Sequence, residues 1–418
     1  MRFLFATWDG GGNVPPTLAL ARQLLRRGHS VRVLGPPSLR LRFAGAGCAF
    51  AAYERVPNGV PSAAGKSGLG RVRAARLVTE LARAAPAFGF AEDVLGELDR
   101  APVDALVVDF MLAGAVAAAE RAGLPTAALM HTVFCLPAPG RPPFGPGLDA
   151  RGDRVGRLRD AAILGLRRRA NRGALADLND ARQHVGLAPV VSASDQLARV
   201  ARVLVLTSAA FDSPSATLPP NVRYVGPQLD NSWSEGLDLS RPRDRKPLVV
   251  VSFSTRFAAV SVGQRVLDAL ATLPVRGLIT LGPALAPEDL RVPANILVRS
   301  FVPHRAVLPR AQLVVTHGGL GTVMAALAHG VPLVCIPLKN DQYENAMRVR
   351  ASGAGRCLGR HATHRSLRRA ILEVLDEHRF SDAARRLASA IATDGGRAVE
   401  ELEALSTTSQ AAAAAFRS

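Results

Sequence analysis

The chain has 418 residues and a mass of 44.0 kDa, a length that exceeds a single compact core and suits two domains. Hydrophobic residues make up 48% and charged residues 21%, which excludes a disordered chain and supplies enough apolar side chains for two cores. The net charge of +18 is typical of nucleic-acid binding, but aromatic residues are only 5% and are not interleaved with the arginines. We therefore expect no nucleic-acid partner.

The first half of the chain alternates between apolar runs and helical patterns. The predicted strands are residues 2–7, 30–34, 103–109, 126–130 and 202–206. The predicted helices are residues 17–27, 112–122 and a long arginine-rich stretch over 154–184. Alternation of this kind predicts a parallel sheet that is wrapped by helices. A segment rich in proline and glycine, residues 137–153, interrupts it and is expected to be an exposed loop.

The periodicity stops at residue 226 and restarts at residue 247, which divides the chain into two halves. We predict a first Rossmann-like domain over residues 1–226 and a polar linker over 227–246. A second Rossmann-like domain follows over 247–405, and a mobile tail over 406–418. The strands of the second domain are predicted at 248–253, 277–280, 295–298, 312–316 and 333–336, with final helices at 366–378 and 380–391.

The sequence also bears on location and on metal binding. The first residues enter a strand directly, without the pattern of a signal peptide, and no apolar run reaches the roughly 20 residues that span a bilayer. The four cysteines are far apart and show no metal-like spacing. We expect a cytoplasmic protein with reduced thiols, no membrane span, no metal ion and no cofactor.

The most informative segment covers residues 316–349. His317, Gly318 and Gly319 follow the predicted strand 312–316 and precede the helical pattern of residues 322–329. A helix start offers unpaired backbone N–H groups and the positive end of the helix dipole, and glycines let an anion approach the backbone. The segment therefore predicts a site for a diphosphate. The loop 337–342 follows the next strand, at the sheet edge where ligands bind.

This segment resembles the donor-binding signature of family-1 glycosyltransferases. The signature consists of His-Gly-Gly, Gly-Thr, Gly-Val-Pro, Pro, Asp-Gln and Asn-Ala in that order. The chain has them at His317-Gly318-Gly319, Gly321-Thr322, Gly330-Val331-Pro332, Pro337, Asp341-Gln342 and Asn345-Ala346. A lone histidine or glycine at such a turn is usually structural, but the complete ordered set indicates a donor site.

The resemblance covers nearly the whole chain and implies an α/β protein of the GT-B fold. In that fold two Rossmann-like domains face each other across a cleft, the donor lies on the second domain, and the last helix crosses back to the first. By the resemblance, His317, Thr322 and the helix start at Gly319 and Gly321 hold the diphosphate. Val302 holds the nucleotide base, and Asp341 and Gln342 hold the sugar hydroxyls. The turn after Phe253 departs from the family, which usually has Gly-Ser there, and its candidate phosphate contact is Thr255.

The first loop departs from the family at the position of the general base. Residues 8–16, WDGGGNVPP, lie where the family has Gly-His-x-x-Pro, so that Asn13 falls on the histidine position. In the family this histidine removes the acceptor proton, and an aspartate that matches Asp109 orients it. An amide accepts no proton near neutral pH. Asn13 can therefore position an acceptor but cannot act as the base.

Three explanations of this departure remain open. Asp9 acts as the base if apolar neighbours such as Trp8 and Phe5 raise its pKa. Alternatively, an acidic acceptor arrives already ionised, or the chain has lost its activity. His131, after the strand 126–130, is a reserve base, although a histidine there is more often a wall residue. The residues expected to line the acceptor site are Trp8, Gly12, His131 and Phe134.

The resemblance thus implies an inverting, metal-independent glycosyltransferase that uses a TDP- or UDP-sugar. The expected acceptor is a small, largely apolar natural product such as a polyketide or an aromatic aglycone, and the expected assembly is a monomer or homodimer. Two alternatives stay open. One is a non-catalytic partner that activates another transferase, and the other is a transferase docked on membranes by its arginines and acting on a lipid acceptor.

Overall fold

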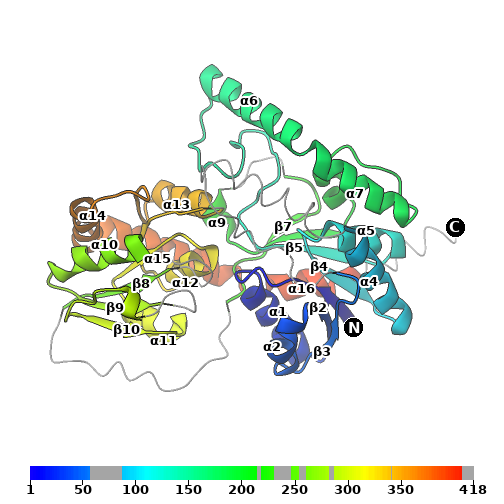
Figure 1. Ribbon diagram of the computed structural model, residues 1–418, viewed down its shortest axis with the longest axis horizontal. Helices are drawn as coiled ribbons and strands as arrows, with labels where there is room; N and C mark the ends of the chain where they lie inside the picture. The colour runs from blue at the N-terminus through cyan, green and yellow to red at the C-terminus, as the bar shows by residue number, and fades with distance from the viewer. Residues whose placement is uncertain are drawn as a thin grey trace.

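A computed structural model of the protein describes residues 1–56, 87–213, 218–229, 246–253, 260–281, 287–339 and 341–406. It contains two parallel sheets, each of which has helices on both sides (Figure 1). The first sheet has the order β3-β2-β1-β4-β5-β6-β7, and the second has the order β10-β9-β8-β11-β12-β13. The prediction of two Rossmann-like domains is therefore confirmed.

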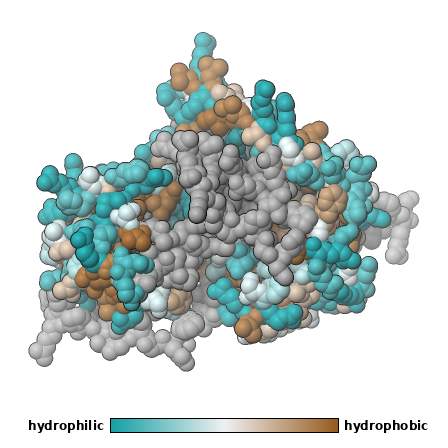
Figure 2. Space-filling view, viewed as in Figure 1, coloured by the Kyte–Doolittle hydropathy of each residue, from teal (hydrophilic) through white to brown (hydrophobic). Residues whose placement is uncertain are grey.

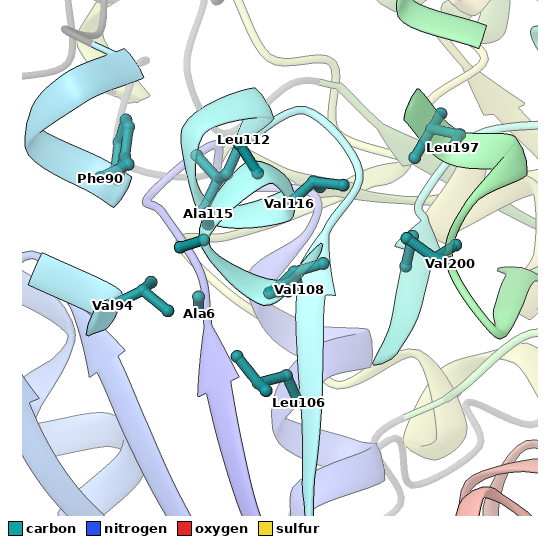
Figure 3. Packing of buried hydrophobic residues seen from close by; sticks show 14 of the residues in the cluster. Ala6, Phe90, Val94, Leu106, Val108, Leu112, Ala115, Val116, Leu197 and Val200 are labelled. Carbon is teal, nitrogen blue, oxygen red and sulfur yellow. The ribbon is translucent and has the colours of Figure 1, made fainter. Parts of the chain in front are cut away.

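The first sheet is built from short, buried apolar segments. Its strands are β1 (Arg2–Ala6), β2 (Ser30–Gly35), β3 (Ala49–Ala52), β4 (Ala105–Asp109), β5 (Thr126–Met130), β6 (Arg202–Val205) and β7 (Val222–Tyr224). The helices are α1 (Val14–Arg26), α2 (Arg40–Ala44), α4 (Ala87–Arg100), α5 (Ala113–Ala122), α6 (Arg154–Ala170), α7 (Arg172–His184), α8 (Ala193–Ala198) and α9 (Ala209–Asp212). Figure 3 shows one core face, where Ala115 and Val116 of α5 lie over Val108 and Leu106 of β4. Burial of this apolar surface fixes the end of β4, which carries Asp109.

The second sheet repeats the same construction. Its strands are β8 (Leu248–Ser252), β9 (Arg276–Thr280), β10 (Ile296–Arg299), β11 (Leu313–Thr316), β12 (Leu333–Cys335) and β13 (Gly355–Cys357). Its helices are α10 (Val260–Ala271), α11 (His304–Val307), α12 (Leu320–Ala328), α13 (Gln342–Ala351), α14 (His364–Asp376), α15 (His378–Thr393) and α16 (Arg397–Glu403). Strands β8 and β11 are buried throughout, as expected for a parallel sheet that is covered on both faces.

Each sheet reverses its strand order at one point. In the first sheet β2 and β3 lie on one side of β1, and the later strands follow on the other side from β4 onward. In the second sheet the same reversal falls between β8 and β11. Ligands of such sheets bind beyond the carboxyl ends of the strands at the reversal. The topology therefore marks two positions, one at the ends of β1 and β4 and one at the ends of β8 and β11.

The carboxyl ends of β5 and β6 face helix α12 of the second domain. Val133, just after β5, and Phe211 of α9 are buried in an apolar cluster of second-domain residues. The hydroxyl of Thr207, just after β6, lies 3.1 Å from the sulfur of Met324 in α12. Glu344 of α13 accepts hydrogen bonds from two N–H groups of the 131–153 loop, at 2.7 and 2.8 Å. The end of the first sheet thus meets the helix that starts after His317.

The last helix returns to the first domain. Helix α16, red in Figure 1, buries Val399 and Leu402 in the same cluster as α1 residues of the first domain. Glu403 accepts hydrogen bonds from Arg27 at 2.7 Å and forms a pair with His29 at 2.8 Å. The division of the chain at residues 226 and 247 stays a prediction, because residues 230–245 of the expected linker lie outside the described part. Most of the expected tail, from residue 407, also lies outside it.

Asp212 forms a buried ionic link between the domains that the sequence patterns do not indicate. Its carboxylate accepts hydrogen bonds from Arg141 at 2.5 Å and from Arg348 of α13 at 2.6 Å. It also accepts from the Tyr224 hydroxyl at 2.6 Å and from the Phe134 N–H at 2.8 Å. Although burial opposes ionisation, Arg348 and Arg141 hold the pKa of the Asp212 carboxyl below its usual value.

We predict that Asp212→Asn lowers the free energy of unfolding by about 3–5 kcal/mol, because it leaves the partly buried guanidinium of Arg141 without its anion and leaves Arg348 with Glu344 alone. Urea unfolding followed by circular dichroism measures this. Asp382→Asn is the matched control, since Asp382 forms an exposed pair with Arg385 and should contribute little. Equal stability changes in the two variants would show that the link does not stabilise the fold.

Several element boundaries differ from the sequence predictions. Helix α1 begins at Val14, three residues before the predicted start, because Pro15 and Pro16 fill its first turn, where no N–H is needed. The stretch 154–184 is two helices that divide at Asn171. Asp341 precedes the first turn of α13 and does not lie in an open loop. The short strands β3, β7 and β13 were not predicted.

Candidate active site

Asp109, at the end of β4, joins three side chains at the first strand reversal. Its side chain is 2% exposed. One carboxylate oxygen, Oδ2, accepts hydrogen bonds from Trp8 Nε1 at 3.0 Å and from Asn13 Nδ2 at 2.9 Å. His131 Nε2 lies 3.3 Å from the same oxygen. The other oxygen accepts from the Met111 N–H at 3.0 Å. We call Trp8, Asn13, Asp109 and His131 the Asp109 cluster.

The amide of Asn13 is fully used within this cluster. Its Nδ2 donates to the Trp8 carbonyl at 2.9 Å as well as to Asp109, and its Oδ1 accepts from the Gly10 N–H at 3.0 Å. A Cβ at Gly10 would lie 2.7 Å from Asn13 Oδ1 and 2.8 Å from the Trp8 ring, so this approach requires glycine. Asn13 therefore holds the loop after β1 in shape and fixes Trp8 beside Asp109.

The other residues predicted for the acceptor side lie around this cluster. Asp9 is partly buried and accepts a hydrogen bond from the Ser38 hydroxyl at 3.3 Å. Gly12 is exposed, and no atom lies within 4 Å of a Cβ built there. Phe134 is 2% exposed, packs in the core of the first domain and has Arg141 over its ring. The roles of these residues toward an acceptor, and of Asp9 as a base, stay predictions.

The second strand reversal carries His317 and the start of α12. His317 is 7% exposed, and its ring centroid lies 6.4 Å from that of Phe253, just after β8. Burial, only partly opposed by a hydrogen bond with the Ser252 backbone, lowers the pKa of His317 to about 4. The imidazole is therefore neutral near pH 7, and it can donate one hydrogen bond without carrying a charge.

Glycines make this turn possible. Gly318 has a φ of +85°, which favours glycine, and a Cβ at Gly319 would lie 2.8 Å from His317 Nε2. Gly319 caps α12, so the N–H groups of its first turn have no acceptor within the helix. Gly321 is exposed and Thr322 is partly exposed, so this helix start is open to a ligand. His317, Gly319, Gly321 and Thr322 lie together at this turn, and their contacts with a diphosphate stay a prediction.

The remaining donor candidates differ in their surroundings. Val302 is 4% exposed and packs in the apolar cluster that contains β11 and α12 residues. Gln342 uses its side-chain oxygen to accept from the N–H groups of Leu338 and Lys339, both at 3.0 Å. Thr255 lies outside the described residues. The contacts of these residues with a donor stay predictions.

Asp341 is linked to the turn at Gly318 through Asn345, a link that the sequence patterns did not predict. Asn345 Nδ2 donates to Asp341 Oδ2 at 3.0 Å and to the Gly318 carbonyl at 2.9 Å. Burial raises the pKa of Asp341 to about 6, against the lowering effect of Asn345. The four-residue spacing of Asp341 and Asn345 could have predicted this link, since residues four apart lie on one face of a helix.

We predict opposite effects of Asp341→Asn on stability and on sugar use. A carboxyl with a raised folded-state pKa stabilises the fold below its unfolded pKa, near 4, and loses that contribution as the pH rises through about 6. At pH 7.5 the variant should therefore be more stable by roughly 1–3 kcal/mol. Transfer should fall, because a carboxylate accepts hydroxyl hydrogen bonds better than an amide, while affinity for the bare nucleoside diphosphate should not change.

Urea unfolding at pH 5 and 7.5, with calorimetric titration of the nucleoside diphosphate, measures these effects. Wild-type transfer should also fall as the pH drops below about 6, as Asp341 is protonated. Equal losses of affinity for nucleotide and of transfer would count against a role in sugar recognition. A fall in stability at pH 7.5 would contradict the pKa shift.

The fold and these two positions define a class of protein. Two Rossmann-like domains, an open helix start after a buried histidine on the second, and an aspartate cluster on the first are the architecture of GT-B glycosyltransferases. Within the described part of the chain, no helix is long and apolar enough to cross a membrane. In the same part, no group of three or more His, Cys, Asp and Glu side chains is placed to hold a metal ion.

Comparisons with known proteins give the family. A family model described as erythromycin biosynthesis protein CIII-like, C-terminal domain, matches residues 264–404. The 4'-demethylrebeccamycin synthase of Lentzea aerocolonigenes is 32% identical over 412 residues, which cover 92% of this chain and 94% of the relative. The demethyllactenocin mycarosyltransferase of Streptomyces fradiae is 31% identical over 261 residues, 62% of this chain and 53% of the relative.

Solved structures agree in fold. A kitacinnamycin glycosyltransferase superposes with a TM-score of 0.77 at 22% identity, and a calicheamicin glycosyltransferase with 0.76 at 23%. Each comparison covers 97% of this chain and 98% of the other. The chain therefore belongs to the family-1 glycosyltransferases of the GT-B fold, of the bacterial natural-product type.

Proposed function

We propose that this protein transfers a sugar from a TDP- or UDP-sugar to a small, largely apolar natural-product acceptor, with inversion at the anomeric carbon and without a metal ion. The observation that carries the proposal is the open, glycine-capped start of α12 beside the buried His317. A diphosphate fits such a start, since the free N–H groups and the helix dipole both favour negative charge.

The proposed reaction is a single in-line displacement. The acceptor oxygen forms a bond to the anomeric carbon, the bond from that carbon to the diphosphate breaks, and its electron pair leaves with the diphosphate. The N–H groups at the start of α12 and His317 stabilise the leaving charge, the task that a metal ion performs in other enzymes. Asp341 and the NH₂ group of Gln342 hold the sugar hydroxyls and so orient the anomeric carbon.

The choice of acceptor class rests on the relatives. The names of two of them refer to a demethylrebeccamycin and a demethyllactenocin, and two structural neighbours are described as glycosyltransferases of kitacinnamycin and calicheamicin. We infer an acceptor of the same general kind, a natural-product aglycone. Trp8 and Gly12, on the loop after β1, are the proposed acceptor contacts, and a cytoplasmic protein that is a monomer or homodimer fits this role.

The test is a transfer assay with TDP- and UDP-glucose and a panel of aromatic and polyketide aglycones, with products identified by mass spectrometry. We expect a glycoside of β configuration from an α-linked donor, and equal turnover with and without EDTA. Retention of configuration would refute the inverting displacement. If the protein binds nucleotide but neither transfers nor hydrolyses any donor, it is a non-catalytic partner of another transferase. That alternative remains because Asn13 replaces the catalytic histidine of the family.

One surface observation favours the membrane-associated alternative. Helix α6 projects from the body of the molecule (Figure 1) and carries six arginines and one aspartate. Val155, Leu158 and Leu166 are 62–72% exposed on it, and Figure 2 shows apolar and polar side chains mixed over this projection. Salt-sensitive sedimentation with anionic liposomes would support this alternative, and no binding at low salt would exclude it.

A further inference from the structure

The imidazole of His131 is a buried group for which the structure gives no hydrogen-bond partner. Its side chain is 7% exposed, and neither ring nitrogen forms a hydrogen bond within the described residues. Buried polar atoms are nearly always paired, so an unpaired imidazole indicates a group that is held for a ligand or a proton. Nε2 lies 3.3 Å from Asp109 Oδ2, too poorly aligned for a hydrogen bond but close enough to form one after a small rotation.

The position of His131 places this imidazole where the two domains meet. It follows β5 directly and begins the 131–153 loop, whose Val133 is buried against the second domain. The neighbouring strand β6 leads to Thr207, which contacts Met324 of α12. An acceptor between the Asp109 cluster and the donor site on α12 would therefore pass beside His131.

We propose that His131 is the general base, and that Asp109 orients it. This inference rests on the proposed function. Asp109 matches the aspartate that orients the histidine of the family. In this chain Asp109 Oδ2 accepts a hydrogen bond from Asn13 Nδ2 at 2.9 Å, and His131 Nε2 lies 3.3 Å from the same oxygen. The aspartate–histidine pair is kept, but its histidine comes from the end of β5 and not from the loop after β1.

The proton transfer can be written atom by atom. Nε2 carries a proton toward Asp109, and Nδ1 accepts the proton of the acceptor hydroxyl as its oxygen bonds to the anomeric carbon. The electron pair of the broken carbon–oxygen bond leaves with the diphosphate. The resulting imidazolium is stabilised by the Asp109 carboxylate, as in other aspartate–histidine pairs. Asn13 shapes the loop and takes no part in the proton transfer.

Asp9 is the alternative base, and it is less well placed in the structure. It accepts a hydrogen bond from Ser38, while the Trp8 ring that was expected to shield it donates to Asp109. His131 is in contact with the carboxylate that the family uses, whereas the Asp109 cluster does not include Asp9. Substitution of each residue separates the two hypotheses.

Nitrogen NMR of the full-length protein tests the proposed tautomer without any substrate. With ¹⁵N-labelled histidine, the His131 signals are assigned by their loss in His131→Gln. We expect the neutral ring to carry its proton on Nε2, with Nδ1 unprotonated. A ring with the proton on Nδ1 would overturn the proposal, because the nitrogen that faces away from Asp109 could then accept nothing.

Kinetics tests the role in proton removal. The acceptors are 4-nitrophenol, 4-cyanophenol and phenol, in order of decreasing acidity, with the glucose donor that the wild type uses. His131→Gln should lose about 10²- to 10⁴-fold in turnover with phenol and less than about 10-fold with 4-nitrophenol, which is largely ionised at pH 8. A merely structural role would lower all three rates by the same factor.

Two further variants complete the comparison. His184→Gln, a histidine that pairs with Glu92 on the exposed surface, is the matched control and should behave as wild type. Asp9→Asn should change each rate by less than about threefold. A graded loss in Asp9→Asn with none in His131→Gln would overturn the proposal. Failure of the wild type to use any donor would count against the proposed function alone, and the tautomer measurement would still decide the inference.

Discussion

Replacing Asp109 by asparagine should lower turnover by about 10²- to 10⁴-fold while leaving nucleotide affinity within a factor of about three. Asp109 Oδ2 accepts hydrogen bonds from Trp8 and Asn13. In one orientation of the new asparagine side chain, an NH₂ group would replace this oxygen and face these two donors. In the other orientation, the charge that stabilises a protonated His131 is lost. A loss of this size is typical when the partner of a general base is neutralised.

The measurement is steady-state transfer with phenol as acceptor, together with calorimetric titration of the nucleoside diphosphate. Asp104→Asn is the matched control, since Asp104 precedes the same strand at its opposite end and pairs with Arg2 on the surface. Turnover of Asp109→Asn within a factor of ten of wild type would contradict the role of the Asp109 cluster. A parallel loss of nucleotide affinity would show a structural effect instead.

Replacing His317 by alanine should weaken nucleoside diphosphate binding by about 10- to 100-fold. The imidazole is neutral, buried and adjacent to Gly319, so that its N–H would face the proposed diphosphate at the start of α12. Loss of a hydrogen bond to a charged group corresponds to about 1.5–3 kcal/mol. Thr322→Ala should have a smaller effect of the same kind, because the backbone N–H groups remain.

Calorimetric titration with TDP and UDP measures both affinities. His329→Ala is the matched control, because His329 lies at the other end of α12 and binds the Ala325 carbonyl at 2.8 Å. An affinity of His317→Ala within a factor of two of wild type would show that the diphosphate binds elsewhere. Equal losses of affinity in His317→Ala and His329→Ala would indicate damage to the helix as a whole.

The fold could be predicted because its signals are local. Parallel strands that are covered on both faces appear as continuous apolar runs, and β5 (Thr126–Met130) was predicted to the residue. The start of α1 was misplaced, because two prolines after Asn13 suggested a loop, although a first helical turn accepts proline. The strands β3, β7 and β13 lie at the edges of the two sheets, and most of their residues are exposed or only partly buried, unlike the residues of the buried inner strands that were predicted.

The candidate site could be predicted only in part. The candidate donor site at the start of α12 could be predicted from the sequence, because His317, Gly319 and Thr322 lie within six consecutive residues. The Asp109 cluster was harder, since His131 and Asn13 are 118 positions apart in the sequence and meet only because β1, β4 and β5 are neighbours in the sheet. Among the described residues the His131 nitrogens have no hydrogen-bond partner, which is a packing property that no sequence pattern encodes. The same holds for the link from Asp212 to Arg348.

We propose above all that the start of α12 holds the diphosphate of a nucleotide-sugar donor. A crystal structure of the protein with bound TDP or UDP tests it most directly. We expect the diphosphate within hydrogen-bond distance of His317 and of the N–H groups of Leu320, Gly321 and Thr322, with the base beside Val302. A nucleotide bound on the first domain, or a diphosphate with no contact to this helix start, would contradict the account.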